Sequence, residues 1–199
     1  MRAKLSFSLG ALALAGLVAC ASSTASLDER SSSPDEDASA GATVAAQSTD
    51  DYVPTEADFA CLSTWTQVRK MRITNPLGDA ATNEALAIAT KSQSGAEYPV
   101  GTIVQIIPTH AMAKRRQGFN ARGNDWEFFV LDVSDAGTRI EQRGGAEVTA
   151  PQIGSCQQCH TRAKSYDFLC EENHGCKSNG HTPAELMEMQ ADDPRCASH

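Results

Sequence analysis

The sequence predicts an α+β domain in which N-terminal helices are followed by a small antiparallel β-sheet and a cysteine-rich C-terminal segment. Apolar residues at helical spacing and an alanine-rich run lie before residue 92, whereas β-branched and aromatic residues dominate between residues 101 and 144. Most of the seven cysteines follow that β-rich region. These three observations set the order of the elements.

Two helices are expected at the start of the domain. The first is expected to begin at Thr55, with Asp58 in a capping-box position. Its apolar residues recur near helical spacing, at Phe59, Leu62, Trp65 and Val68. After a break at 75–78, the alanine-rich run 79–91 predicts the second helix.

Three strands are expected next. The run 101–108 is β-branched, 125–133 is rich in aromatic residues and valine, and 137–144 alternates. The polar residues 134–137 predict a hairpin turn between the last two strands.

The first twenty residues are typical of an export signal. Arg2 and Lys4 precede an apolar stretch at 5–19, which ends in Leu-Val-Ala before Cys20. This ending resembles a lipobox and predicts a lipid anchor on Cys20. We therefore expect a periplasm-facing lipoprotein of the cell envelope, with the outer membrane as the favoured location.

Residues 21–51 are expected to be a disordered acidic tether, because they contain no aromatic residue and are rich in serine and alanine. The chain carries a net charge of −8. Much of this charge lies in the tether, so the single domain expected at 52–199 is only mildly acidic. Its basic residues gather only at 114–116, which argues against a nucleic-acid partner.

Cys156, Cys159 and His160 form a Cys-x-x-Cys-His sequence, which is the spacing for c-type haem attachment. The two thiols can each form a thioether with one porphyrin, and the adjacent imidazole can bind its iron. The motif thus predicts one haem c, with His160 as the proximal metal ligand.

Three other interpretations fit part of this pattern, one of which is a structural disulfide between Cys156 and Cys159 with an incidental histidine. A structural zinc site would use Cys156, Cys159, Cys170 and Cys176, and would make the protein a structural envelope lipoprotein. A thioredoxin-like dithiol would need a βαβ context, which the sequence does not show.

Four cysteines remain after the lipid and haem positions are assigned, and an even number in an exported protein predicts two disulfides. We favour Cys170 with Cys176 and Cys61 with Cys196. The histidines at 174, 181 and 199 are expected to be solvated.

The motif lies late in the chain, and Met187 and Met189 follow it on a short expected helix. Packing on the helix face is the favoured role for both methionines. Axial ligation by one of them would instead make the protein a periplasmic electron-transfer cytochrome. Met112 falls in a stretch interpreted as a loop.

Five segments, in this order, resemble the cytochrome P-four-sixty and c′-beta family. They are "STWTQV" at 63–68, "MRITNP" at 71–76, "YPVGT" at 98–102, "DWEFFVLD" at 125–132 and "CQQCHTRAKSYDF" at 156–168. The resemblance implies a mostly antiparallel β fold, a possible homodimer and one c-type haem on His160. It also implies that the protein binds or oxidises small nitrogen species such as nitric oxide or hydroxylamine.

One branch of this family carries a lysine bonded to the porphyrin, and Ile106 occupies the matching position. Lys114 is the nearest alternative but is interpreted as a surface charge. The resemblance therefore points to the gas-binding branch, with an apolar distal pocket. The candidate pocket residues are Phe119, Trp126 and Phe128, and strand alternation means that Phe128 and Phe129 cannot both face the haem.

Three charged residues near these segments have two interpretations each. Glu127 is either a distal proton donor or a solvated strand residue, and Arg162 and Lys164 either pair with haem propionates or lie exposed. The sequence identifies neither a catalytic residue nor a redox partner. It predicts a small-ligand or redox haem protein, and an oxidoreductase if it is an enzyme.

Overall fold

The computed structural model describes residues 50–151, 154–178 and 180–196. The export signal, Cys20, most of the tether and His199 lie outside these residues. None of the described helices is long and apolar enough to cross a membrane.

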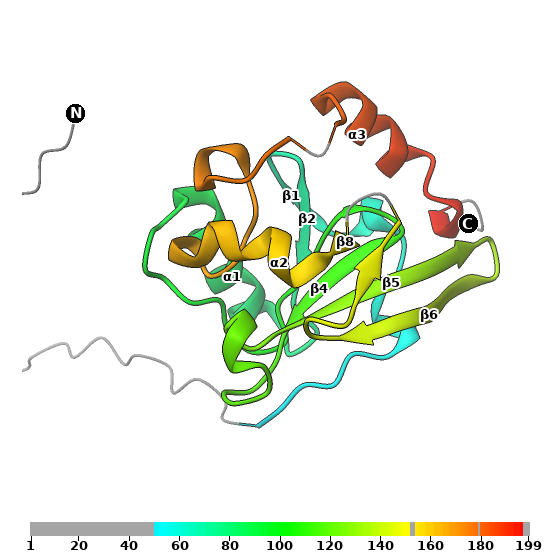
Figure 1. The fold of residues 1–199 in the computed structure, drawn as a ribbon. Coiled ribbons are helices and arrows are strands. Elements are labelled where there is room, and N and C mark those ends of the chain that lie inside the picture. Colours follow the sequence, from blue (N-terminus) through cyan, green and yellow to red (C-terminus); the bar gives the residue numbers. More distant parts are fainter. Residues whose placement is uncertain (1–49, 152–153, 179, 197–199) are drawn as a thin grey trace, which may run out of the picture. The chain divides into compact units, whose positions relative to one another are not determined.

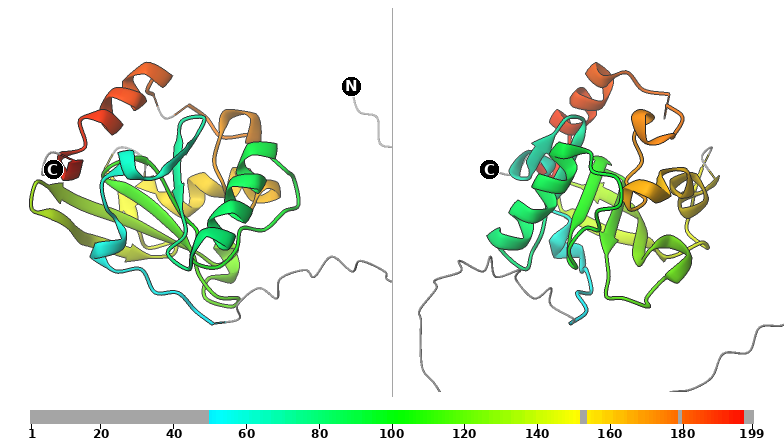
Figure 2. Two further views of the ribbon diagram at one scale, coloured as in Figure 1. Left: turned by 180° about the vertical axis from the view of Figure 1, so that it is seen from behind. Right: turned by 90° about the vertical axis from the view of Figure 1, so that its left-hand side faces the viewer.

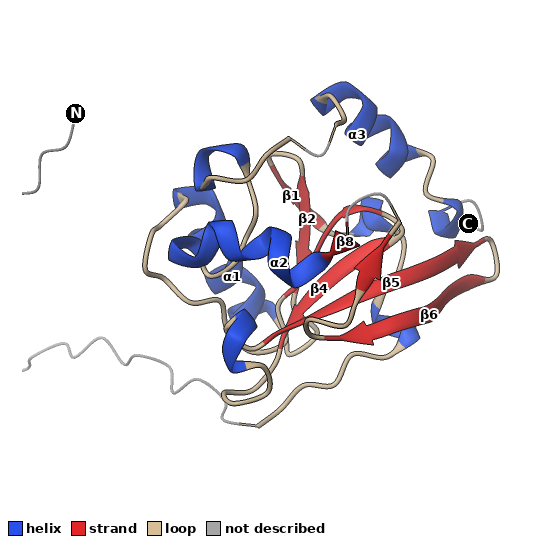
Figure 3. Cartoon of the chain, viewed as in Figure 1, coloured by secondary structure: helices blue, strands red, loops and turns tan. Residues whose placement is uncertain are grey.

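Six antiparallel strands form the central sheet, in the spatial order β1-β2-β3-β4-β5-β6 (Figures 1 and 3). The strands are β1 (Thr66–Val68), β2 (Met71–Thr74), β3 (Ile103–Ile107), β4 (His110–Lys114), β5 (Trp126–Ser134) and β6 (Gly137–Gly144). The α+β class with an antiparallel sheet is therefore confirmed. The predicted turn at 134–137 joins β5 to β6, with Ser134 opposite Gly137.

The helix α1 (Asp79–Lys91) has the predicted bounds, but it follows two strands and does not precede the whole sheet. Its buried residues Ala85 and Ala89 pack onto the sheet. Small side chains at these positions allow the helix to lie close to the strands.

The helix predicted from Thr55 is wrong. The capping box of Thr55 and Asp58 forms, but it opens only the 3₁₀ turn Glu56–Asp58. A second 3₁₀ turn, Leu62–Thr64, leads directly into β1. Of the apolar residues that suggested a helix, Phe59, Leu62 and Trp65 are buried on one sheet face, and Val68 is buried on the other.

The sheet carries a separate hydrophobic cluster on each face. The motif face holds Val104, Met112, Trp126, Phe128 and Val130, together with residues of α1 and of the segment after the motif. The opposite face holds Ile103, Ala111, Ala113, Phe129 and Leu131, covered by the segment 59–65. Phe128 and Phe129 thus lie on different faces, as strand alternation predicts.

The C-terminal tail contains α3 (Pro183–Ala191) and the turn Pro194–Cys196. In the views of Figures 1 and 2, α3 lies apart from the shorter helix α2 (Cys156–His160). Gln190 of α3 donates to the carbonyls of Lys70 and Ile106, at 2.8 Å each. The tail is therefore held to the sheet by hydrogen bonds from a side chain to backbone carbonyls.

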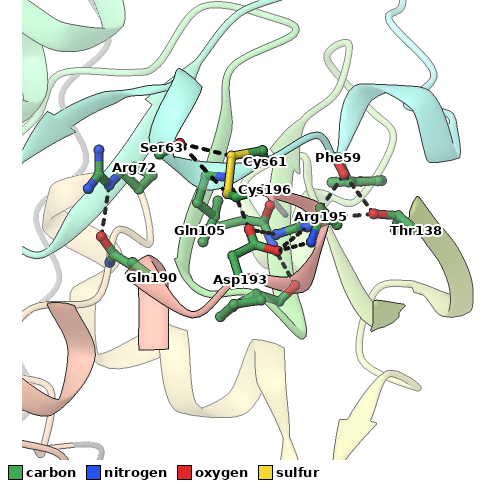
Figure 4. Close-up of polar contacts among 12 residues, drawn as sticks. Phe59, Cys61, Ser63, Arg72, Gln105, Thr138, Gln190, Asp193, Arg195 and Cys196 are labelled. Carbon is green, nitrogen blue, oxygen red and sulfur yellow. Dashed lines mark hydrogen bonds and ion pairs between the residues drawn. A yellow bond between two sulfur atoms is a disulfide. The ribbon is translucent and has the colours of Figure 1, made fainter. Parts of the chain in front are cut away.

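The end of the tail is fixed by a buried ion pair beside a disulfide (Figure 4). Asp193 accepts from Arg195 at 2.7 and 2.8 Å and from the Leu62 amide at 3.0 Å. Arg195 also donates to the Phe59 carbonyl at 2.9 Å. These contacts lower the pKa of Asp193 although its burial opposes the shift.

Substituting Asp193→Asn is expected to lower the free energy of unfolding at neutral pH by about 1–3 kcal/mol, because Arg195 loses its charged acceptor. A carboxyl group whose pKa is lower in the folded state stabilises the fold above its ordinary pKa of 3.8 and loses this effect as the pH falls further. The difference between wild type and variant should therefore shrink below about pH 4. Urea unfolding at a series of pH values measures it, and a difference independent of pH would contradict the assignment.

Candidate haem-attachment site

The helix α2 begins where a short hairpin ends. The strands β7 (Thr149–Ala150) and β8 (Gly154–Ser155) pair just before the helix. Ser155 caps it by accepting a hydrogen bond from the Gln158 amide, and the Cys156 amide donates to the Val148 carbonyl at 3.1 Å. The motif is therefore held at the exit of a hairpin.

Helical geometry brings the three motif residues together, since positions i, i+3 and i+4 share one helix face. Cys156 and Cys159 are both free thiols and half-buried. Cys156 packs against the cluster of the motif face, and this burial raises the pKa of its thiol. Both sulfur atoms are therefore available for covalent attachment.

His160 is oriented by a backbone carbonyl. Its Nδ1 lies 2.7 Å from the carbonyl oxygen of Phe168. A carbonyl only accepts, so Nδ1 carries the proton and Nε2 carries the lone pair. Burial lowers the pKa of His160, which favours the neutral imidazole. This is the form in which histidine binds a metal.

The ring of Phe128 contacts the histidine of the motif. The two rings meet edge to face, with the centroids 5.2 Å apart. Trp126 lies on the same sheet face, whereas Phe119 lies 4.3 Å from the Arg115 guanidinium. Of the three predicted pocket residues, the structure brings Trp126 and Phe128 to the motif face and gives Phe119 a different partner.

Lys114 is buried, so its interpretation as a surface charge is wrong. Its Nζ lies 2.8 and 2.9 Å from the carboxylate oxygens of Asp167 and 2.8 Å from the Asn124 carbonyl. Burial raises the pKa of Asp167, and the Lys114 charge opposes that rise. Asp167 was not predicted as a site residue; its one local signal is that it is an acidic residue between two aromatic residues.

Glu127 is neither solvated nor on the motif face. It is buried on the face of Phe129 and forms ion pairs with Arg115 and Arg143. Arg115 also pairs with Asp51, so this last residue of the predicted tether is anchored to the domain. Glu127 therefore does not face the motif.

Ile106, which occupies the family's cross-link position, packs against the cluster of the motif face. Arg162 and Lys164 are exposed. Lys164 lines an open cavity of about 450 Å³ together with Thr161 and Phe168. The lining of this cavity does not include the three motif residues, so the cavity lies beside the end of α2 and does not contain the motif.

Of the three methionines considered, only Met112 lies in an unexpected element. Met187 and Met189 lie on α3, as predicted, and the side-chain nitrogen of Gln67 donates to the Met187 sulfur at 3.3 Å. Met112 belongs to β4 and not to a loop; it is buried on the motif face, directly opposite Phe128. Met112 is therefore the methionine nearest in the sheet to the residue that contacts His160.

The remaining cysteines form the two disulfides that the sequence analysis favours, Cys61 with Cys196 and Cys170 with Cys176. The second disulfide leaves two of the four zinc ligands considered above without a free thiolate. Among the described residues, no group of three or more His, Cys, Asp or Glu side chains is arranged to hold a metal ion. A c-type haem would need only one such side chain as an iron ligand, which here would be His160.

His174 is buried, so its expected solvation is wrong. Its ring stacks on Tyr166 at 3.8 Å, and its Nδ1 lies 2.7 Å from the Leu169 carbonyl. His174 lies in the short loop that the Cys170–Cys176 disulfide closes, and this loop packs it against Tyr166, after the motif.

In comparisons with known proteins, the chain matches no family model, no curated protein and no solved structure.

Proposed function

We propose that the protein is an exported, lipid-anchored haem protein that carries one haem c on Cys156, Cys159 and His160. The observation that carries this proposal is the geometry of α2. One helix face carries two free thiols and an imidazole whose Nδ1 is hydrogen-bonded to the Phe168 carbonyl. Anchoring through Cys20 on the periplasmic side rests on the N-terminal sequence alone.

The donor set fits a c-type haem. Two thiols supply the thioether positions, and a neutral imidazole with a free lone pair supplies one iron ligand. When bound, the haem would supply an iron centre for electron transfer or for binding a small ligand. The protein's own contribution is to orient His160 and to surround the site with the apolar side chains of the motif face.

The function that we favour is binding of a small ligand such as nitric oxide, or redox chemistry of a small nitrogen compound. An open iron position is needed for either. Two of the charged residues considered in the sequence are engaged in ion pairs: Glu127 is paired on the opposite face, and Lys114 is bound by Asp167. The aromatic Phe128 is the side chain that contacts the histidine ring.

Production of the mature domain alongside a haem-attachment system is expected to give covalent haem that persists through denaturing electrophoresis. The double variant Cys156→Ala/Cys159→Ala should lose that haem stain. The matched control is Cys170→Ser/Cys176→Ser, which removes the other cysteine pair and should keep it. Loss of stain in both variants, or in neither, would contradict the assignment of the thioethers.

A second candidate function is electron transfer, and the position of Met112 favours it. Met112 is buried on the motif face opposite Phe128. A sixth ligand from Met112 would leave no open iron position.

The small-ligand function predicts that the reduced protein changes its visible spectrum when carbon monoxide is added, and that Met112→Leu leaves this response unaltered. Met187→Leu on α3 serves as the control. A wild type insensitive to carbon monoxide, with sensitivity gained only in Met112→Leu, would instead identify an electron carrier ligated by Met112.

A further inference from the structure

The turn that follows the motif has an uncommon backbone. Asp167 and Phe168 are consecutive non-glycine residues with φ angles of 49° and 61°. Side chains on Cβ disfavour this left-handed region, most of all bulky ones. Such conformations persist only where the surroundings impose them, and they cluster at functional sites. The question is what holds these two residues and to what effect.

The carboxylate of Asp167 is held by four donor groups from three parts of the chain. Lys114 at the end of β4 contacts both oxygens, and the Tyr98 amide donates at 2.7 Å. Asn124 and the indole nitrogen of Trp126, the latter at 3.2 Å, complete the set. The side chain is 1% exposed, so these donors replace water completely.

Phe168 is fixed through its neighbour and through its own packing. Its ring is buried in the cluster of the motif face, and its amide donates to the Ala163 carbonyl at 3.0 Å. The peptide unit that carries the Phe168 carbonyl is held by the Leu169 amide, which donates to the Tyr166 carbonyl. The Phe168 carbonyl points to Nδ1 of His160, at 2.7 Å.

The next carbonyl is held from the other side. His174 donates its Nδ1 proton to the oxygen of Leu169 and stacks on Tyr166. The Leu169 amide in turn donates to the Tyr166 carbonyl at 3.0 Å. The peptide unit whose carbonyl accepts from His160 is thus held on one side by the bound carboxylate of Asp167. On the other side it is held by the buried imidazole of His174.

We propose that Asp167 is a positioning residue for His160. Through Phe168 it fixes the carbonyl that receives the Nδ1 proton, and so sets the orientation and basicity of Nε2. A histidine ligand whose other nitrogen donates to a fixed acceptor is the more basic ligand. The part of this proposal that concerns iron rests on the proposed function; the part that concerns the imidazole does not.

The imidazole is tested in the haem-free mature chain by nitrogen-15 NMR. In the wild type, the Nδ1 proton of His160 should exchange slowly with solvent. Asp167→Asn keeps the side-chain shape and a residue that tolerates the left-handed region, but removes the charge that binds Lys114. The variant should exchange this proton faster. Trp126→Phe removes a single donor to Asp167 and should accelerate exchange of the same proton to a smaller extent. It replaces Asp167→Asn in the test if that variant does not fold.

The matched control is Asp193→Asn. Asp193 is as buried as Asp167 and is likewise bound to a cation and a backbone amide, but in the C-terminal tail. The Asp193→Asn variant should have a lower free energy of unfolding but an unchanged exchange rate of the His160 Nδ1 proton. Unchanged exchange in Asp167→Asn and Trp126→Phe, or equal acceleration in Asp193→Asn, would overturn the proposal.

The iron is tested by the iron–histidine stretching frequency of the reduced, haem-loaded protein. A less basic His160 should shift this frequency downward in Asp167→Asn and leave it unchanged in Asp193→Asn. The double variant Lys114→Gln/Asp167→Asn keeps the net charge and should show the same downward shift, which separates positioning from charge. If the wild type holds no haem, the proposed function fails, and the NMR experiment still decides the role of Asp167.

Discussion

Replacing Cys61 and Cys196 together by serine is expected to lower the free energy of unfolding by about 5 kcal/mol. The disulfide joins residues 135 positions apart, so its removal releases a loop that comprises almost the whole domain. The entropy that a crosslink removes from the unfolded chain grows with the length of this loop. Since domains are commonly stable by about 5–15 kcal/mol, the variant should lose at least about a third of its stability.

The second disulfide provides the matched control. Cys170 and Cys176 are 6 positions apart, and Cys170→Ser/Cys176→Ser should cost only about 2 kcal/mol on the same reasoning. Urea unfolding of both variants under non-reducing conditions measures the difference. Equal losses would show that loop closure is not what stabilises the domain.

Substituting Lys114→Met is expected to destabilise the domain by about 3–5 kcal/mol, because it leaves the buried carboxylate of Asp167 without its cation. Lys164→Met is the control, because Lys164 is exposed, and it should change stability by less than about 0.5 kcal/mol. The midpoint of urea unfolding, at an unchanged dependence on urea, is the measurement.

A double variant separates the unpaired charge from lost packing. Lys114→Met/Asp167→Asn removes the uncompensated carboxylate and should recover part of the stability that Lys114→Met loses. If the double variant is less stable than Lys114→Met by the full effect of Asp167→Asn, the two side chains do not act as a pair.

Local signals in the sequence were sufficient for α1 and for the β5–β6 hairpin. The helix is specified by its own alanine-rich composition, and the hairpin by the turn residues between two β-rich runs. The Cys-x-x-Cys-His motif is equally local, since its meaning depends on spacings within five residues.

Non-local contacts decided where the predictions failed. Phe59, Leu62 and Trp65 recur at helical spacing, but they lie in and beside short turns and are buried against one face of the sheet. Met112 lies in a strand because β3 and β5 pair with it on both sides. No pattern within the segment 110–114 contains that information.

The burial of Lys114 was likewise set by a distant partner. Its neighbours Arg115 and Arg116 suggested a basic surface, yet strand alternation turns Lys114 to the motif face and Arg115 to the other. The partner Asp167 lies 53 positions further along the chain. Pairing at such separation is fixed by the topology of the sheet and is not visible in either segment alone.

The central claim, that Cys156 and Cys159 carry a haem, is tested most directly by the intact mass of the wild-type mature chain after denaturation. The chain is to be produced with a haem-attachment system and unfolded in acid before the measurement. We predict the mass of one chain plus one haem, with both thiols consumed. The mass of the bare chain, with Cys156 and Cys159 free or joined to each other, would contradict the account.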